Sequence, residues 1–451
     1  MFKKIEIWIL YLTILLSILF AIGFGVLVRQ ELVGSTKAGW VSKTALILAE
    51  IPVNLKKIIG NDLVLDDRFS NLDGFNGTPN SEESYLLLSR YDGDLQEGVF
   101  ELVDLRSFEV LHTWNPDIDA FNDLVEGIDE FKYLERDKNN KRSILIHPKL
   151  TSDGGLLFQH DTPLRKINAC SNLISQNTHD EFHHSIETDI DGNIWVPSRF
   201  YPLSLPIEKV GRDTKPEGGF FDDAIVKLSP EGEILFEKSV SQIFIDNGLE
   251  YLLFSVGDML FDVDPIHLND IQPVNFDGEF WKKGDVFLSL RHQSMVLLYR
   301  PSTNEIIWKG TGAFFHQHDV DILDEHRISI FNNNSKDFID GDVVDGHNEV
   351  IIYDFKTNEY SFYLKDSLIE NDVRTITEGR SEILTNRDLF VEESNYGRTL
   401  YFNADGALKW THVNRAENGN VYAVGWSRIL YTEEDIQTVN NFLNNRGTCN
   451  E

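Results

Sequence analysis

The sequence is short of cysteine, of methionine and of positive charge, and each shortage excludes a class of protein. Only two of its 451 residues are cysteine, Cys170 and Cys449. Two are too few for a disulfide framework or a cysteine-based zinc site, and the sequence leaves open whether they pair. Three methionines argue against a methionine-lined helical groove. The formal net charge of −32 makes a nucleic-acid partner unexpected, because phosphate binding depends on basic patches.

Long apolar runs are also scarce, and the one present lies at the N-terminus. No charged residue occurs from Ile7 to Val28, and Lys3 and Lys4 precede the run. Because about 20 apolar residues cross a bilayer, we predict a transmembrane signal-anchor over residues 1–30. A cleaved signal peptide is the alternative. The flanking charges are nearly balanced, and we expect the large domain to lie outside the cytoplasm, in the periplasm or at the cell surface.

The anchor is followed by a predicted linker over residues 31–60. Apolar residues at three-to-four spacing from Trp40 to Ile51 predict an amphipathic helix that ends at Pro52. This helix could be a stalk packed on the following domain or a helix lying on the membrane surface.

Beyond the linker, short alternating runs separated by Asp-Gly, Glu-Gly or Asn-Gly turns replace helix signals until Trp426. They recur as a loose repeat of two strands, a turn and a strand that ends in an aromatic residue. The units lie near residues 84–116, 148–176, 183–240, 267–312, 316–366 and 377–430. Such units bury their faces against one another in a radial array, so we predict an all-β fold, a six-bladed β-propeller over residues 61–451. Seven blades or two sandwiches are the alternatives. A helix from Thr432 is expected to cover the last blade.

Histidines stand where three of these strand-like runs begin. The first run carries His183 and His184, the second His267, and the third His316 and His318. Residues two apart in a strand share a face, so His316 and His318 are expected to point the same way. In a propeller the innermost strands line one central channel, so these histidines are expected to converge.

An arginine, Arg291, interrupts a fourth apolar run at residues 288–294. A charge there requires a partner or a polar cavity. His292 is expected to face away from Arg291, and we interpret it as structural. Histidines with an arginine, and with no matching group of acids or cysteines, favour an anion over a metal ion. We therefore predict no metal and no cofactor, with a three-histidine zinc or iron site as the chemical alternative.

The ordered motifs resemble those of the bacterial arylsulfate sulfotransferases, which do not use the nucleotide sulfate donor. The resemblance covers most of Ser84 to Trp426. Its motifs lie at residues 183–184, 267–271, 289–294, 308–310, 317–320 and 386–392.

This resemblance implies a six-bladed propeller that moves a sulfuryl group from an aryl sulfate to a phenol through a sulfohistidine intermediate. It implies His318 as the nucleophile and His184, His267 and Arg291 as assisting groups. Arg291 and one histidine are expected to stabilise the sulfuryl oxygens, and the other histidine to exchange a proton with the phenols.

We assign His183 and His316 to substrate binding. Of the adjacent pair we expect His184 to face the channel, because its place in the strand-start pattern matches that of His318. The sequence departs from the family at Ser185, where relatives often carry Asp, and in lacking the close cysteine pair of soluble members. The alternatives are a non-catalytic propeller that binds a ligand or a protein, and a lyase or hydrolase acting on another anion. Expected partners are a small aryl sulfate, a phenol and the membrane.

Overall fold

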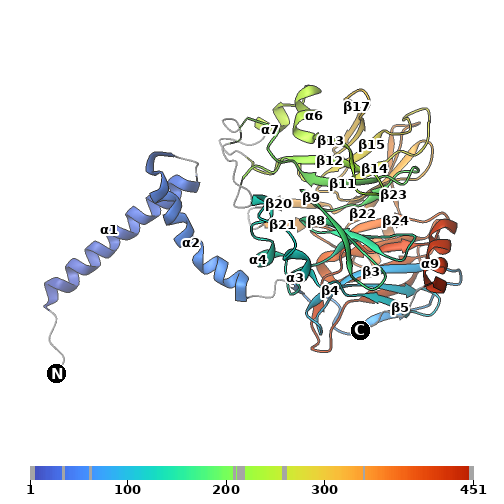
Figure 1. The fold of residues 1–451 in the computed structure, drawn as a ribbon, viewed down its shortest axis with the longest axis horizontal. Coiled ribbons are helices and arrows are strands. Elements are labelled where there is room, and N and C mark those ends of the chain that lie inside the picture. The colour runs from blue at the N-terminus through green and yellow to red at the C-terminus, as the bar shows by residue number, and fades with distance from the viewer. Residues whose placement is uncertain are drawn as a thin grey trace. The chain divides into compact units, whose positions relative to one another are not determined.

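The computed structural model describes residues 6–32, 36–59, 63–206, 210, 219–255, 262–338 and 341–445. The chain divides into two compact units, Met1–Asp62 and Leu63–Glu451. Figure 1 shows a helical N-terminal unit and a β-rich unit.

The N-terminal unit consists of α1 (Ile7–Leu32), a 3-10 turn η1 (Thr36–Ala38) and α2 (Trp40–Ile59). The stretch Ile7–Glu31 is long and apolar enough to cross a membrane, and none of its most apolar window is buried. It is compatible with an anchor or a signal sequence. The two helices pack together, and Ser42 on α2 donates a hydrogen bond to Glu31 on α1. The expected end of the second helix at Pro52 is wrong, because a proline removes only its own N–H bond and α2 continues through it.

The second unit is built from antiparallel sheets. One contains β29 (Arg428–Leu430), β3 (Tyr85–Asp92), β4 (Glu97–Asp104) and β5 (Glu109–Trp114). An eight-stranded sheet contains β6 (Ile146–Leu150), β7 (Leu156–Gln159), β8 (Thr162–Ile167), β9 (Leu173–Phe182), β10 (Glu187–Thr188), β11 (Ile194–Arg199), β12 (Asp223–Leu228) and β13 (Ile234–Ser239).

Three further sheets follow in chain order. They contain β14 (Leu268–Pro273), β15 (Val286–Leu290), β16 (Met295–Arg300) and β17 (Glu305–Thr311); β18 (Val320–Ile322), β19 (Arg327–Asn332), β22 (Glu349–Asp354) and β23 (Glu359–Tyr363); and β24 (Arg380–Ile383), β25 (Leu389–Glu393), β26 (Arg398–Phe402), β27 (Leu408–Val413) and β2 (Gly74–Gly77). Two-stranded ladders join β1 (Val64–Leu65) to β28 (Val421–Tyr422) and β20 (Ser335–Phe338) to β21 (Gly341–Val344).

Short helices connect or cover the sheets. They are α3 (Ile118–Asn122), η2 (Asp129–Phe131), α4 (Leu134–Asp137), α6 (Val240–Asp246), α7 (Tyr251–Phe254), α8 (Lys365–Glu370), η3 (Ser394–Tyr396) and α9 (Glu433–Asn445). The last helix was expected to cover the last blade, and this is wrong. Val439 and Phe442 of α9 pack instead with Trp114 of β5 and Phe158 of β7. The reason is β29, which carries the chain across to the first sheet before α9 begins.

The arrangement is mostly β and propeller-like, as predicted. Within the described residues, four sheets stand alone with four or five strands, whereas a fifth joins eight strands, so the sheet pattern does not confirm six blades. The two ends of the domain interlock, because C-terminal β29 pairs with β3 and N-terminal β2 pairs with β27. Apolar side chains of neighbouring sheets fill the spaces between them, for example Ile225 with Leu288 and Phe287 with Ile351. This packing brings the first strand of successive sheets together.

Candidate active site

At or just before the first strand of successive sheet segments, one residue other than glycine adopts a left-handed backbone. These residues are His147 (φ 47°), His184 (58°), His267 (53°), His316 (50°), Glu378 (59°) and Trp426 (55°). The left-handed region is unfavourable for such side chains and is retained where the surrounding structure enforces it, often at functional sites. Because this conformation recurs at the same end of the inner strands, that end is the candidate functional site.

Aromatic contacts show that several of these strand starts meet. The ring centroid of Trp426 lies 5.5 Å from that of His147, 6.0 Å from that of His184 and 6.1 Å from that of His318. His184 is in turn 5.2 Å from His267 and 6.3 Å from His318, centroid to centroid. Three predicted catalytic histidines, up to 134 residues apart in sequence (318 − 184), therefore form one cluster.

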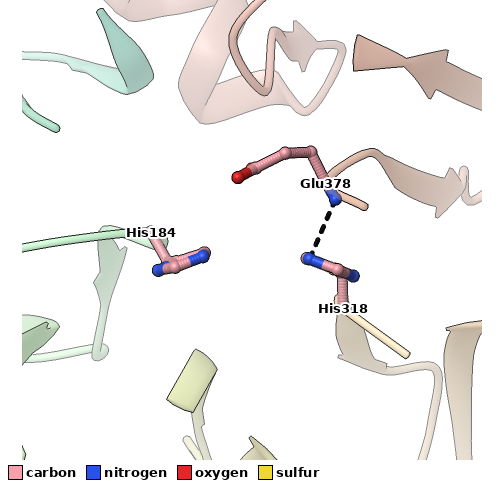
Figure 2. Close-up of side chains that lie close together, drawn as sticks. All are labelled: His184, His318 and Glu378. Carbon is pink, nitrogen blue, oxygen red and sulfur yellow. Dashed lines mark hydrogen bonds between the residues drawn. The ribbon is translucent and has the colours of Figure 1, made fainter. Parts of the chain in front are cut away.

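His318 is fully enclosed, and both of its ring nitrogens have defined partners. Its Nδ1 lies 2.7 Å from Oδ1 of Asn333, and the amide nitrogen of Asn333 donates to the carbonyls of Thr375 and Glu378. Those two donations fix the orientation of the amide, so Nδ1 of His318 must carry the proton. Its Nε2 then carries a lone pair, which accepts a hydrogen bond from the backbone N–H of Glu378 at 2.9 Å (Figure 2).

The charge state of His318 follows from its surroundings. Burial lowers its pKa well below the usual value, and the charge of Arg291 lowers it further, while the hydrogen bond to Asn333 opposes the shift. The imidazole is therefore neutral at physiological pH, with its lone pair on Nε2.

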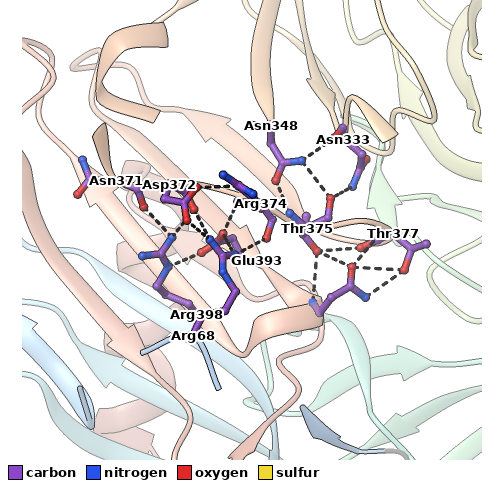
Figure 3. A network of polar contacts seen from close by, with 11 residues as sticks. Arg68, Asn333, Asn348, Asn371, Asp372, Arg374, Thr375, Thr377, Glu393 and Arg398 are labelled. Atoms are coloured by element: carbon purple, nitrogen blue, oxygen red, sulfur yellow. Dashed lines mark hydrogen bonds and ion pairs between the residues drawn. The ribbon is translucent and has the colours of Figure 1, made fainter. Parts of the chain in front are cut away.

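A polar network holds the segment that caps this nitrogen (Figure 3). Asn348 donates to the carbonyls of Asn333 and Thr375 and accepts from the backbone N–H of Thr375. Further along, Arg374 donates its backbone N–H to Glu393, which also accepts from Arg398. With its backbone tied at several points, the segment before Glu378 presents one fixed N–H to His318.

His184 faces the cluster, and His183 lies behind it. Nδ1 of His183 is 2.7 Å from Nδ1 of His184, and Nε2 of His183 is 3.4 Å from Oδ1 of Asp223. Burial lowers the pKa of His184 well below its usual value, and the neighbouring histidines add to the shift. The expected match between the positions of His184 and His318 is wrong. The left-handed backbone of His184 matches that of His267 and His316, whereas His318 comes two residues after such a position.

Asp264 binds His267 from outside the cluster. Its Oδ2 lies 2.6 Å from Nδ1 of His267. Burial favours the neutral acid, but the hydrogen bond and charge of His267, with His292 and Arg199, lower the pKa of Asp264 to about 2. This contact holds the His267 ring in place beside His184.

Arg291 and His292 follow β15 in a turn, so the expectation that they face apart is wrong. Nη1 of Arg291 lies 2.6 Å from Nε2 of His292, and the His292 ring is 4.4 Å from that of His267. Nη2 of Arg291 lies 3.5 Å from a carboxylate oxygen of Asp342 on β21. The guanidinium is mostly buried and borders the histidine cluster through His292.

His316 and His318 do not share a face, because β18 begins only at Val320 and His316 is left-handed. Nδ1 of His316 lies 3.9 Å from Asp337 on β20, and its ring is 6.2 Å from that of His292. Burial, aided by Arg291, lowers its pKa to about 4. His316 therefore lies beside Arg291, at the edge of the cluster.

The sequence reasoning missed Glu378, Asn333, Asp264 and Trp426. The absence of a matching acid is thus a wrong expectation, since the carboxylate of Asp264 binds His267 and a carboxylate oxygen of Glu378 lies within 4.8 Å of ring nitrogens of His184 and His318. One signal was available for Glu378: it opens the unit at residues 377–430, as His267 and His316 open theirs.

Two side-chain groups in this region have the spacing of metal ligands. Donor atoms of His184, His318 and Glu378 lie within 4.8 Å of one another, as do those of Asp264, His267 and His292; a third such group, His179, Asp180 and Glu237, involves none of the predicted site residues. Arg291 places a positive charge near the first two groups, which favours an anion over a cation there.

Comparison with known proteins bears on this cluster directly. A family model described as Arylsulfotransferase (ASST) matches residues 147–415, more than half of the chain. The chain belongs to the arylsulfotransferase family. The match spans every predicted site residue of this arylsulfotransferase, as well as Asn333 and Glu378. No curated protein matches the chain.

Solved structures show only distant likeness. A protein of unknown function from Bacteroides caccae is 12% identical, with a TM-score of 0.45 over 76% of this chain and 98% of its own. A streptogramin B lyase is 10% identical, with a TM-score of 0.37 over 79% and 96%. A virginiamycin B lyase from Staphylococcus aureus is 9% identical, with a TM-score of 0.32 over 59% and 83%. Nothing about this arylsulfotransferase follows from similarity at that level.

Proposed function

We propose that this protein moves a sulfuryl group from an aryl sulfate donor to a phenolic acceptor through a sulfohistidine at Nε2 of His318. One observation carries the proposal: Asn333 holds the proton of His318 on Nδ1, which leaves a buried, neutral imidazole with its lone pair on Nε2. An imidazole in this state is ready to act as a nucleophile without first losing a proton.

In the first half-reaction, the Nε2 lone pair forms a bond to sulfur while the bond from sulfur to the aryl oxygen breaks. The hydrogen bond from the Glu378 N–H gives way as the new bond forms. Arg291 and His267 both act electrostatically on His318. They stabilise the negative sulfuryl oxygens as the group moves to Nε2. Asp264 holds His267 in place through its Nδ1.

In the second half-reaction, the acceptor phenol attacks sulfur, and the electron pair of the N–S bond returns to Nε2. His184 is the base in this step. If His183 directs its Nε2–H toward Asp223, its Nδ1 accepts from Nδ1–H of His184, and Nε2 of His184 is a free lone pair. His183 thus positions His184 from behind, and His316 binds substrate at the rim beside Arg291.

The proposed architecture is a six-bladed propeller in which the eight-stranded sheet is two blades, β6–β9 and β10–β13. In support, the ladder between β9 and β11 has only two residue pairs. We further propose that α1 is an uncleaved signal-anchor and that the catalytic domain is extracytoplasmic. Cys170 is disulfide-bonded, which fits an oxidising compartment; Cys449 lies outside the described residues.

The test uses the full-length protein in detergent, with a sulfur-labelled aryl sulfate and a phenol acceptor. We expect transfer of label to the acceptor with ping-pong kinetics and, without acceptor, a burst of phenol release that leaves label on His318. Release of sulfate to water irrespective of acceptor would indicate a hydrolase. No phenol release with a broad panel of donors would leave a non-catalytic binding propeller.

A further inference from the structure

The first half-reaction needs a proton for the departing aryl oxide, and the histidine cluster is poorly placed to give one. In His318, the only ring proton lies on Nδ1 and is directed to Asn333. In His184, burial and the neighbouring histidines lower the pKa, so the imidazole is neutral and is a poor acid. In His267, Nδ1 is engaged by Asp264 at 2.6 Å. Another acid is therefore needed.

Glu378 is attached to the nucleophile through its own backbone. Its N–H donates to Nε2 of His318 at 2.9 Å, and its carbonyl accepts from the amide of Asn333 at 2.7 Å. Because Asn333 also accepts from His318, the three residues form a closed ring of hydrogen bonds. The left-handed backbone of Glu378 (φ 59°) is held by these contacts.

The side chain of Glu378 is half-buried and lies beside two histidines of the cluster. Figure 2 shows it extending over the space between the rings of His184 and His318. A carboxylate oxygen lies within 4.8 Å of a ring nitrogen of each histidine, while Oε2 is buried and makes no hydrogen bond to any residue that the structure describes. A buried polar atom without a partner is costly, so its retention beside these histidines points to a function.

We propose that Glu378 is the general acid that protonates the departing aryl oxide, a role that rests on the proposed function of His318. As Nε2 bonds to sulfur, the electron pair of the breaking S–O bond goes to the aryl oxygen, which takes the proton of Glu378. In the second half-reaction His184 removes the hydroxyl proton of the acceptor. That proton then passes from His184 to the Glu378 carboxylate, which restores both groups and balances the cycle.

The protonation state of the resting enzyme agrees with this role. Burial raises the pKa of Glu378, against the opposing charges of His267 and Arg291. The carboxyl group consequently holds its proton at a higher pH than an exposed glutamate, as a general acid must.

The experiment compares E378Q with the wild type in single turnovers of aryl sulfates whose leaving phenols range from strongly to weakly acidic. Glutamine keeps the shape and both backbone contacts but has no acidic proton. We expect E378Q to release a nitrophenol within about threefold of the wild-type rate, because that leaving group needs no acid. With the least acidic phenols we expect a loss of about 100-fold or more. The rate should therefore depend more steeply on phenol pKa in E378Q.

Two variants complete the test. E378D retains a carboxylic acid on a shorter arm and should restore part of the lost slope. E382Q removes another enclosed carboxyl, on β24, whose pKa burial raises to about 7 and which contacts Arg380 rather than the histidines. It should leave the slope unchanged.

If E378Q lost the same factor in rate with all donors, or lost no rate with any of them, Glu378 would not be the acid. Label on His318 in E378Q would still uphold the proposed function. A wild type that gave neither a phenol burst nor labelled His318 would overturn both.

Discussion

Two strand starts, residues 267–270 and 316–319, both run from a histidine to an aspartate. They differ at the two positions between, where the first has Leu268 and Asn269 and the second has Gln317 and His318. Each opens with a left-handed histidine, His267 or His316. Each has an aspartate three residues later whose carboxylate accepts a backbone N–H from the next sheet: Asp270 from Val320 at 3.1 Å and Asp319 from Ser381 at 3.1 Å. Between them the first strand start carries Asn269 and the second His318.

The difference separates scaffold from chemistry. Asn269 is fully buried and donates its amide to the carbonyl of Gln317, so it ties one strand start to the next. His318, at the same place in its own strand start, contacts Asn333 and presents a basic nitrogen, Nε2, to the backbone N–H of Glu378. The repeated backbone supplies a rigid position, and the side chain at that position supplies the reaction.

The largest effect is expected from H318N, which gives the second strand start the residue of the first. The variant loses the Nε2 nucleophile, so the phenol burst and the protein-bound sulfate label should fall by about 10³-fold or more. Asparagine fits the equivalent position in the first strand start, and the thermal unfolding curve should change little. Single-turnover assays and circular dichroism measure the two effects.

The matched control is H326N, because His326 lies between β18 and β19 and binds Asp354 outside the cluster. It should retain wild-type turnover. Normal turnover by H318N would show instead that the two strand starts do not differ in chemistry.

A smaller effect is expected from N333L, which removes the partner that only the second strand start has. Without Asn333 the proton of His318 is free to move to Nε2, and the Glu378 carbonyl loses a donor. We expect kcat to fall by about 10- to 100-fold. N333D keeps an acceptor for Nδ1 and adds a negative charge that raises the pKa of His318, so its turnover should decline as the pH falls, whereas that of the wild type should not. Identical pH profiles for N333D and the wild type would argue against a role in fixing the proton.

The mostly β, propeller-like arrangement and the histidines of the cluster could be predicted from the sequence. Turn spacing and alternation predict a mostly β, propeller-like domain because each unit repeats local patterns. The histidines at strand starts are visible for the same reason. Glu378 and Asn333 were missed because their roles depend on which side chains the ring of sheets brings together. His316 was misread because strand alternation was applied to a left-handed position that precedes the strand.

The smallest effect on turnover is expected where the two strand starts agree, at Asp270 and Asp319, yet the stabilities of variants at these positions should differ. Burial and the charge of Asp319 raise the pKa of Asp270 well above its usual value. Burial also raises the pKa of Asp319, but Arg380, with Nε 3.7 Å from its Oδ2, opposes the shift. D270N keeps an oxygen for the N–H of Val320 and removes a repulsion, so it should unfold at the same or a higher temperature at neutral pH.

D319N keeps the same kind of hydrogen bond but leaves Arg380 with a weaker partner, and its free energy of unfolding should fall by roughly 2–4 kcal/mol. The pH dependence sharpens the contrast. Because the folded pKa of Asp270 is raised, its contribution to stability is present below the unfolded pKa and is lost as the pH rises through the folded value. Other buried carboxyls with raised pKa values, such as Asp321 and Glu382, remain in the variant. Denaturation curves between pH 4 and 8 should therefore show a decline in the wild type that is shallower in D270N. Equal destabilisation by D270N and D319N would mean that Arg380 does not distinguish the two aspartates, and that the contrast between the strand starts lies in the residues between histidine and aspartate.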